Sequence, residues 1–313
     1  MTDVVPAALR ERYDRVAVVE QVHDVPPNEV HLVEVDGRRA VLKRSTGPRG
    51  DAAVEGRAQR LAAHESSLSV PSVPWVGANA FLADYDPDAP DEGARPSPTW
   101  CRVSGRALAR LHSITFDRHG PFRVDGDAGD PTAALRVDPS TETWTDALLA
   151  LLDEFRRSVA GTEYTATVDE VAALVRERPE RFTPTGGACE PVLVHGWFSP
   201  EHVAVRDDTV CSVVDFEHAM AGAAEYDLWR LAIPTFGLGT EREDRPAWER
   251  FREAYESVRP LPAGVDARAD ALRLVVAVSY LDSLAVQRGI EGNRNRADAV
   301  RQTVRERLAA LRS

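Results

Sequence analysis

The sequence predicts an α+β protein with two lobes, a small β-rich N-terminal lobe over residues 1–87 and a larger, mainly helical C-terminal lobe over residues 88–313. Three observations predict this fold class. Short alternating apolar runs dominate the first part of the chain, a proline- and acid-rich stretch at Asp86–Gly93 interrupts them, and apolar residues at helical spacing prevail beyond it. A chain of 313 residues is at the upper end for one hydrophobic core, so we expect two closely packed lobes.

The N-terminal lobe is predicted to be a sheet with one helix. Asp36-Gly37 lies between two alternating apolar runs, which is typical of a tight hairpin turn. After a Gly- and Pro-containing break at Gly47–Gly50, apolar residues recur at helical spacing, and this predicted helix carries Glu55. The predicted strands are Val16–Val22, Glu29–Val35, Arg39–Lys43 and Ala80–Tyr85.

The C-terminal lobe is predicted to be helical apart from one hairpin. Val203–Val205 and Val210–Val214 are short apolar runs joined by the polar segment Arg206–Thr209, which has suitable turn residues. The predicted helices are Trp100–Ile114, Trp144–Val159, Val168–Arg178, Trp248–Val258, Ala267–Gln287 and Ala297–Leu311.

Composition limits the partners and the cellular location. The formal net charge of -12 argues against nucleic acid and anionic membranes, because both bind clustered positive charge. The longest apolar run, Leu274–Leu281, is too short to span a bilayer, and the N-terminus has no secretory signal pattern. Three widely spaced cysteines form no disulfide pattern, so we expect a soluble, cytoplasmic protein. Its acidic, lysine-poor composition also fits a halophilic source.

Lys43 is the only lysine in a chain whose other basic side chains are all arginine. Lysine is a compact charge on a flexible stem, whereas arginine is a planar fork, so the two suit different sites. From composition alone, chance and a functional role explain a single lysine about equally well. Lys43 ends a predicted strand and precedes the helix that carries Glu55, which favours a functional role.

The predicted hairpin brings two polar segments together. His195–His202 precedes its first strand, and Asp215-Phe216-Glu217 follows its second, so both segments lie at the same end of the hairpin. Phosphoryl transfer needs such an arrangement, because one loop must meet the attacking hydroxyl while carboxylates hold magnesium, a cation that prefers oxygen ligands. The pattern therefore indicates phosphoryl-transfer chemistry.

These motifs resemble the aminoglycoside phosphotransferase and choline kinase family, whose members have a protein-kinase-like fold. His195-Gly196 matches the opening of the family's HGDxxxxN loop, Asp215-Phe216-Glu217 its metal-binding turn, and Glu225–Leu228 its YDLA-like helix start. The segment Gly105–Phe122 is similar to the first helix of the family's large lobe. The resemblance covers most of the chain and implies ATP and magnesium, or manganese, as cofactors.

The resemblance also implies roles for individual residues. Lys43 would contact phosphate and Glu55 would be its ion-pair partner. Asp215 and Glu217 would bind the metal ion, and Asp227 would brace the catalytic loop by hydrogen bonds. His195 is better explained as a packed loop residue than as a proton donor. The predicted hinge at Asp84 and Tyr85 would meet adenine through its backbone.

Two residues depart from the family pattern. Trp197 occupies the position of the catalytic aspartate, and its indole has one N–H donor and no acceptor, so it cannot take a proton from a hydroxyl. His202 replaces the metal-binding asparagine and offers a nitrogen ligand, which suits a transition metal better than magnesium. Glu201 lies beside His202 and is a candidate substitute base, supported only by its proximity in sequence.

Three functions follow from these observations. The first is an ATP-dependent phosphotransferase acting on an unknown small-molecule hydroxyl with weakened or altered catalysis. The second is a non-catalytic pseudokinase that binds nucleotide or a protein partner. The remote third is a transition-metal hydrolase built from His195, His202, Asp215 and His218. Acidic segments at Asp125–Asp130 and Glu241–Asp244 hint at a cationic ligand, but halophilic surface charge explains them equally well.

Overall fold

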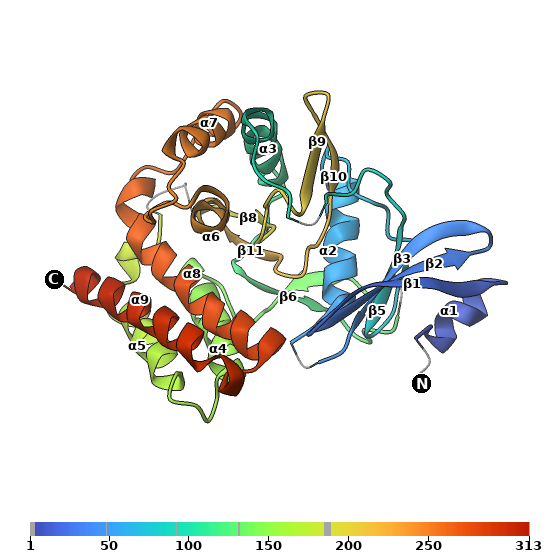
Figure 1. Cartoon of the computed structure of the whole chain (residues 1–313), viewed down its shortest axis with the longest axis horizontal. Helices are drawn as coiled ribbons and strands as arrows, with labels where there is room; N and C mark the ends of the chain where they lie inside the picture. Colours follow the sequence, from blue (N-terminus) through green and yellow to red (C-terminus); the bar gives the residue numbers. More distant parts are fainter. Residues whose placement is uncertain (1–3, 48, 92, 131, 185–188, 313) are drawn as a thin grey trace.

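The computed structural model describes residues 4–47, 49–91, 93–130, 132–184 and 189–312. It has a β-sheet N-terminal lobe and a mainly helical C-terminal lobe, so the predicted two-lobed α+β fold class is confirmed. In Figure 1 the N-terminal sheet and α1 (Ala7–Arg12), in blue, lie at one end of the molecule, and the C-terminal helices, in red, lie at the other.

The N-terminal lobe is built on a five-stranded antiparallel sheet in the order β1-β2-β3-β5-β4. The turn between the second and third strands places Asp36 at φ 48° and Gly37 at φ 79°, the left-handed values that a tight Asp-Gly hairpin requires. Alternate residues of the sheet, among them Val33, Leu42 and Leu82, are buried in one apolar cluster. The strands are β1 (Val16–Val25), β2 (Asn28–Val35), β3 (Arg38–Ser45), β4 (Trp75–Val76) and β5 (Ala80–Asp84).

Helix α2 (Ala52–Glu65) packs against this sheet and also reaches the C-terminal lobe. The side chain of Asp51 caps its N-terminus by accepting a hydrogen bond from the backbone N–H of Val54 at 3.0 Å. The buried Arg57 donates to the backbone carbonyls of Ala133 and Asp130. The helix is therefore fixed at both lobes, and Glu55, on its buried face, is held in one place.

The C-terminal lobe contains the predicted helices with small shifts at their ends. Trp100, Phe236 and Phe251 pack together with Trp248 in an aromatic cluster of its core. No helix in the described part of the chain is both long enough and apolar enough to cross a membrane. The helices are α3 (Pro98–Leu111), α4 (Trp144–Ser158), α5 (Thr165–Glu177), α6 (Ala224–Phe236), α7 (Arg245–Glu256), α8 (Val265–Arg288) and α9 (Arg294–Arg312).

The expectation that a single hairpin interrupts these helices was wrong. The predicted hairpin is present as β9 (Val203–Arg206) and β10 (Thr209–Val213), but a second, four-stranded sheet lies beside it in the order β7-β6-β11-β8. Its strands are β6 (Gly120–Val124), β7 (Leu135–Val137), β8 (Pro191–Val194) and β11 (Met220–Ala223). These strands have three to five residues, too few for alternation to appear in the sequence, and β11 runs directly into α6.

Candidate active site

Asp227, in the first turn of α6, is bonded to the loop that begins at His195 and to His112 at the end of α3. Its two carboxylate oxygens each accept a backbone hydrogen bond at 2.7 Å, one from His195 and one from Gly196. His112 contacts the same carboxylate through Nε2 at 3.1 Å and the Tyr255 hydroxyl through Nδ1 at 2.8 Å. Burial acts to raise the pKa of Asp227, but the hydrogen bond and charge of His112 lower it below its ordinary value overall. The loop is thus held through its backbone by a buried carboxylate.

Gly196 lets this loop approach the next segment closely. Its φ of 82° is in the left-handed region, and a Cβ there would lie 2.5 Å from the Cβ of His218. His195 is fully buried, and its ring accepts from the backbone N–H of Trp197 through Nδ1 and donates to the carbonyl of Val214 through Nε2. Both ring nitrogens are occupied, so His195 holds the loop against the end of β10.

Lys43 forms the link between the two lobes. Its Nζ donates to Glu55 Oε1 on α2 at 2.8 Å and to Asp215 Oδ1 at 2.6 Å, and it lies 3.6 Å from Glu217 Oε2. Glu217 also accepts a hydrogen bond from the Asn28 side chain at 2.6 Å. Asp215 has a φ of 68°, a left-handed value that aspartate adopts more easily than most residues. The structure therefore brings the predicted lysine and all three predicted carboxylates into one cluster.

Burial and charge act against each other in this cluster. Burial acts to lower the pKa of Lys43, but the charges of Asp215, Glu55 and Glu217 outweigh it and hold that pKa well above its ordinary value. Burial likewise acts to raise the pKa of Asp215, and the charges of Lys43 and His202 bring it below its usual range. Burial raises the pKa of Glu55 and of Glu217 against the opposing charge of Lys43. At neutral pH the Lys43–Asp215 pair is therefore fully ionised.

Trp197 is half-buried and directed toward α6. The guanidinium carbon of Arg230 lies 5.2 Å from the centroid of its ring, and Nε of Arg230 donates to the carbonyl of Gly196. Arg230 is 4% exposed and also contacts the Tyr226 hydroxyl at 3.2 Å. A cation over an indole face is a favourable contact, so Trp197 is packed in place by Arg230.

His202, the last residue of the His195–His202 loop, contacts the loop backbone on one side and Asp215 on the other. Its Nδ1 is 2.9 Å from the carbonyl oxygen of Trp197, and its Nε2 is 3.1 Å from Asp215 Oδ2. Both neighbours are hydrogen-bond acceptors, so the ring either donates from both nitrogens or donates from Nδ1 and shares a cation with Asp215 through Nε2. The Asp215 oxygen concerned is the one that does not face Lys43.

Glu201, Asp84 and Tyr85 lie outside this cluster. Glu201 is exposed, and its Oε1 accepts a hydrogen bond from the backbone N–H of Gly93 at 3.1 Å. Glu201 and Trp197 line a cavity of about 630 Å³. Neither Lys43 nor Asp215 lines this cavity. Asp84 is exposed at the end of β5, and Tyr85 is 40% exposed with Arg39 over its ring. The adenine contact through the backbone of this segment stays a prediction.

The transition-metal hydrolase gains no support from the geometry. Among the described residues, the acidic, histidine and cysteine side chains close enough to share an ion in a group of three or more are Glu55, Asp215 and Glu217. That group includes no histidine, and both ring nitrogens of His195 have other partners. His218 Nε2 instead lies 3.3 Å from Glu217 Oε1.

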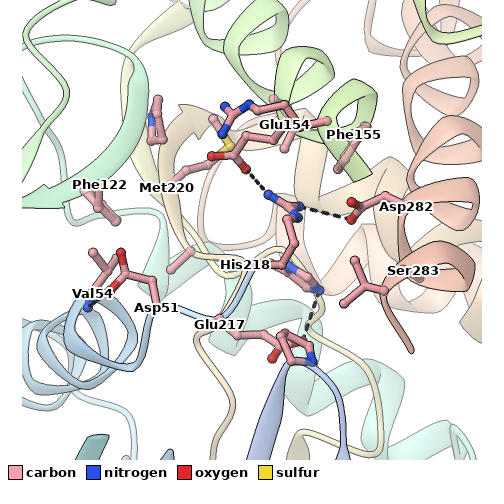
Figure 2. Close-up of a pocket in the computed structure, with 18 of the residues that line it drawn as sticks. Asp51, Val54, Phe122, Glu154, Phe155, Glu217, His218, Met220, Asp282 and Ser283 are labelled. Atoms are coloured by element: carbon pink, nitrogen blue, oxygen red, sulfur yellow. Dashed lines mark hydrogen bonds and ion pairs between the residues drawn. The ribbon is translucent and has the colours of Figure 1, made fainter. Parts of the chain in front are cut away.

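A cavity of about 220 Å³ lies next to Glu217 and His218, between the two lobes. Arg49 donates hydrogen bonds to Glu154 and Asp282, both of which are labelled in Figure 2. Arg230, Tyr226 and Phe122 contribute to its walls. The cavity adjoins the cluster of Lys43 and Asp215 through Glu217, which belongs to both.

Sequence reasoning missed four residues of this region. Asn28 and Arg49 contact carboxylates that are more than 100 positions away along the chain, so no local pattern marks them. His112 is found only through its contact with Asp227, 115 positions away. Arg230 does follow Tyr226 at the i, i+4 spacing of one helix face, which was a usable signal.

Comparison with known proteins agrees with these features. The sequence model of the phosphotransferase enzyme family, APH, matches residues 24–266. A search of curated proteins finds no match. Among solved structures, a protein provisionally described as a fructosamine-3-kinase from Thermobifida fusca superposes with a TM-score of 0.67 at 21% identity, with 98% of each chain covered.

Two phosphotransferases of known structure share the fold. A thermostable mutant of aminoglycoside phosphotransferase APH(4)-Ia, in complex with ADP and hygromycin B, gives a TM-score of 0.62 at 18% identity over 98% of both chains. Macrolide 2'-phosphotransferase MphH from Brachybacterium faecium gives 0.55 at 19% identity, with 93% of this chain and 92% of that chain covered. These similarities confirm the protein-kinase-like fold, and the family model, which spans most of the sequence, shows that this chain belongs to the phosphotransferase enzyme family.

Proposed function

We propose that this protein binds ATP with a divalent metal ion, magnesium or manganese, and transfers phosphate to a small-molecule hydroxyl with weakened catalysis. One observation carries the proposal: Lys43 of the N-terminal lobe bonds both Glu55, at 2.8 Å, and Asp215 of the C-terminal lobe, at 2.6 Å. A lysine held at this junction suits a nucleotide phosphate, because phosphoryl transfer depends mainly on positioning and charge. The ADP in the related aminoglycoside phosphotransferase structure supports nucleotide use.

The residues present fit a divalent cation. Asp215 Oδ2 and His202 Nε2 face each other at 3.1 Å, and His202 already spends its Nδ1 proton on the Trp197 carbonyl. Asp215 and Glu217 would hold the ion through carboxylate oxygens, since both belong to the group of described side chains close enough to share one. His202 offers a nitrogen beside Asp215, which would favour manganese over magnesium, but it does not form such a group with Asp215 and Glu217. Such an ion supplies positive charge against the transferring phosphate. Glu55 belongs to the same group of three carboxylates, and we assign it as the ion-pair partner of Lys43.

Weakened transfer follows from the residue at position 197. Indole accepts no proton, and its ring packs under Arg230, so the loop offers no base there. A general base contributes on the order of 10² to 10⁴ in rate, whereas charge and positioning supply most of the acceleration in this reaction. Lys43, Asp215 and Asp227 would retain that larger share. Glu201 is exposed, and its carboxylate accepts a hydrogen bond from the backbone N–H of Gly93, so it is a poor replacement.

A pseudokinase is the second candidate, and the packing of Trp197 favours it. The contact with Arg230 and the hydrogen bonds of Asp227 stabilise the loop whether or not a substrate arrives. A loop stabilised in this way would suit a protein that binds nucleotide and presents a fixed shape to a protein partner.

Nucleotide binding tests both candidates. ATP with magnesium or manganese should raise the melting temperature of the wild type, and Lys43→Ala and Asp215→Asn should each abolish the rise. Asp208→Asn, at an exposed turn between β9 and β10, is the matched control and should keep it. No stabilisation in the wild type by either metal complex would overturn both nucleotide proposals.

Turnover then separates the two candidates. Slow ADP release that depends on one member of a panel of sugars, aminoglycosides and amino alcohols would identify an enzyme and its acceptor. Stabilisation by ATP without acceptor-dependent ADP release across that panel would favour the pseudokinase.

A further inference from the structure

Arg49 reaches from the N-terminal lobe across the cavity between the lobes to two helices of the C-terminal lobe. It lies in the connection between β3 and α2, and its guanidinium donates to Glu154 Oε2 on α4 at 2.9 Å and to Asp282 Oδ2 on α8 at 3.1 Å. In Figure 2 dashed lines end on the labelled Glu154 and Asp282. One side chain therefore joins three elements that are far apart in the sequence.

The carboxylates it bridges are buried to different degrees. The side chain of Asp282 is 7% exposed and that of Glu154 is 34% exposed. Removing a carboxylate from water is unfavourable without a cation beside it, so this pair of helices needs a positive charge at this point. Burial acts to lower the pKa of Arg49, but Asp282 and Glu154 outweigh it and raise that pKa.

Arg49 leaves part of this region unsatisfied. Asp282 Oδ1 and Asn28 Oδ1 are buried acceptors without a hydrogen-bond partner, and Nε of Arg49 is a buried donor without one. All three residues line the same cavity. Buried polar atoms are normally paired, so these three mark a place where the hydrogen bonding is incomplete without a further molecule.

We propose that Glu154 and Asp282 form a cation-binding subsite of this cavity and that Arg49 is its internal occupant in the ligand-free protein. An ammonium or guanidinium group of a small ligand replaces Arg49 there. The ligand is small because the cavity has a volume of about 220 Å³. Asp282 Oδ1 would accept a second N–H from the incoming group, which Arg49 does not supply. Departure of Arg49 would also release its link between the lobes.

The identity of this ligand as the phosphate acceptor rests on the proposed function, whereas the occupancy of the cavity does not. The test therefore contains no nucleotide. Methylguanidine and ethanolamine are titrated into wild type, Arg49→Ala and Arg157→Ala, and binding is measured by calorimetry. Arg157 is the matched control, because it lines the same cavity but pairs with Asp153 on its own helix.

Arg49→Ala should bind methylguanidine at least about tenfold more tightly than wild type. In the wild type Arg49 occupies the subsite most of the time, and the apparent affinity is reduced to the fraction of molecules in which the subsite is free. Adding Asp282→Asn to Arg49→Ala should remove that binding, and Arg157→Ala should behave as wild type. Equal affinity in wild type and Arg49→Ala, or an equal gain in Arg157→Ala, would overturn the proposal.

A folding defect would not obscure the result. If Arg49→Ala unfolds in part, methylguanidine at millimolar concentration should raise its melting temperature more than that of wild type, since it replaces the missing cation. Urea at the same concentration is the control for solvent effects. Arg49→Lys keeps a cation at this position and should respond less than Arg49→Ala. A melting temperature of Arg49→Ala that does not respond to methylguanidine would also reject the internal occupant.

Discussion

The two halves of the candidate active site differ in what holds them together. In the half around Lys43, the side chains bond one another: Lys43 to Glu55 and Asp215, and Asn28 to Glu217. In the catalytic loop, Asp227 bonds the backbone of His195 and Gly196. The two backbone hydrogen bonds of Asp227 do not involve the side chain at position 197, so they are compatible with a tryptophan there.

The largest effect is expected from restoring the acid. Trp197→Asp combined with His202→Asn should raise ADP release by about 10² to 10⁴, the contribution of a general base, because the hydrogen bonds of Asp227 would hold the loop backbone and aspartate, unlike indole, can accept a proton. Turnover of ATP with the best acceptor measures it. Trp197→Asn with His202→Asn is the control without a base, and equal rates in the two double variants would show that the loop is not preserved as described.

The backbone support itself is tested at Asp227. Asp227→Ala leaves two buried N–H groups and the paired His112 without their partner, so the free energy of unfolding should fall by about 3 to 5 kcal/mol. Urea denaturation measures the change. Asp153→Ala, at an exposed carboxylate, should leave the unfolding curve as in wild type. A loss at Asp227 no larger than at Asp153 would contradict the account of the loop.

His195 makes this half of the site sensitive to acid. Burial lowers the pKa of His195 to about 4 from an ordinary value of 6.5. Between pH 4 and pH 6.5, His195 is therefore protonated in the unfolded chain and neutral in the native protein. The resulting stability is complete above pH 6.5 and is lost as the pH falls toward 4, by about 3 kcal/mol in all. Urea unfolding of wild type and His195→Asn at pH 7 and pH 5 measures it. The variant should lose less stability than wild type between the two pH values, and an equal loss would count against a neutral, buried His195.

The smallest effect is expected at Glu201. Its carboxylate is exposed and accepts a hydrogen bond from the backbone N–H of Gly93, so Glu201→Gln should leave ATP turnover unchanged. Steady-state ADP release is the measurement. A fall in the rate of ADP release of about 10²-fold or more would instead identify Glu201 as the substitute base.

Much of the fold could be predicted because its signals are local. The Asp36-Gly37 turn, the β9–β10 hairpin and the long amphipathic helices follow from turn residues and apolar spacing within short windows. The sheet of β6, β7, β8 and β11 could not, because its strands are short and gain their stability from partners distant in sequence.

The sequence by itself determined the family motifs and the chemical departure: an indole cannot accept a proton at position 197, wherever the chain places it. The tertiary structure alone decided which partners each group has. Arg230 over Trp197, Arg49 between Glu154 and Asp282, and Asn28 on Glu217 all join segments that only folding brings together. The physical reason is that charge and hydrogen bonding act over a few ångströms in space, irrespective of separation along the chain.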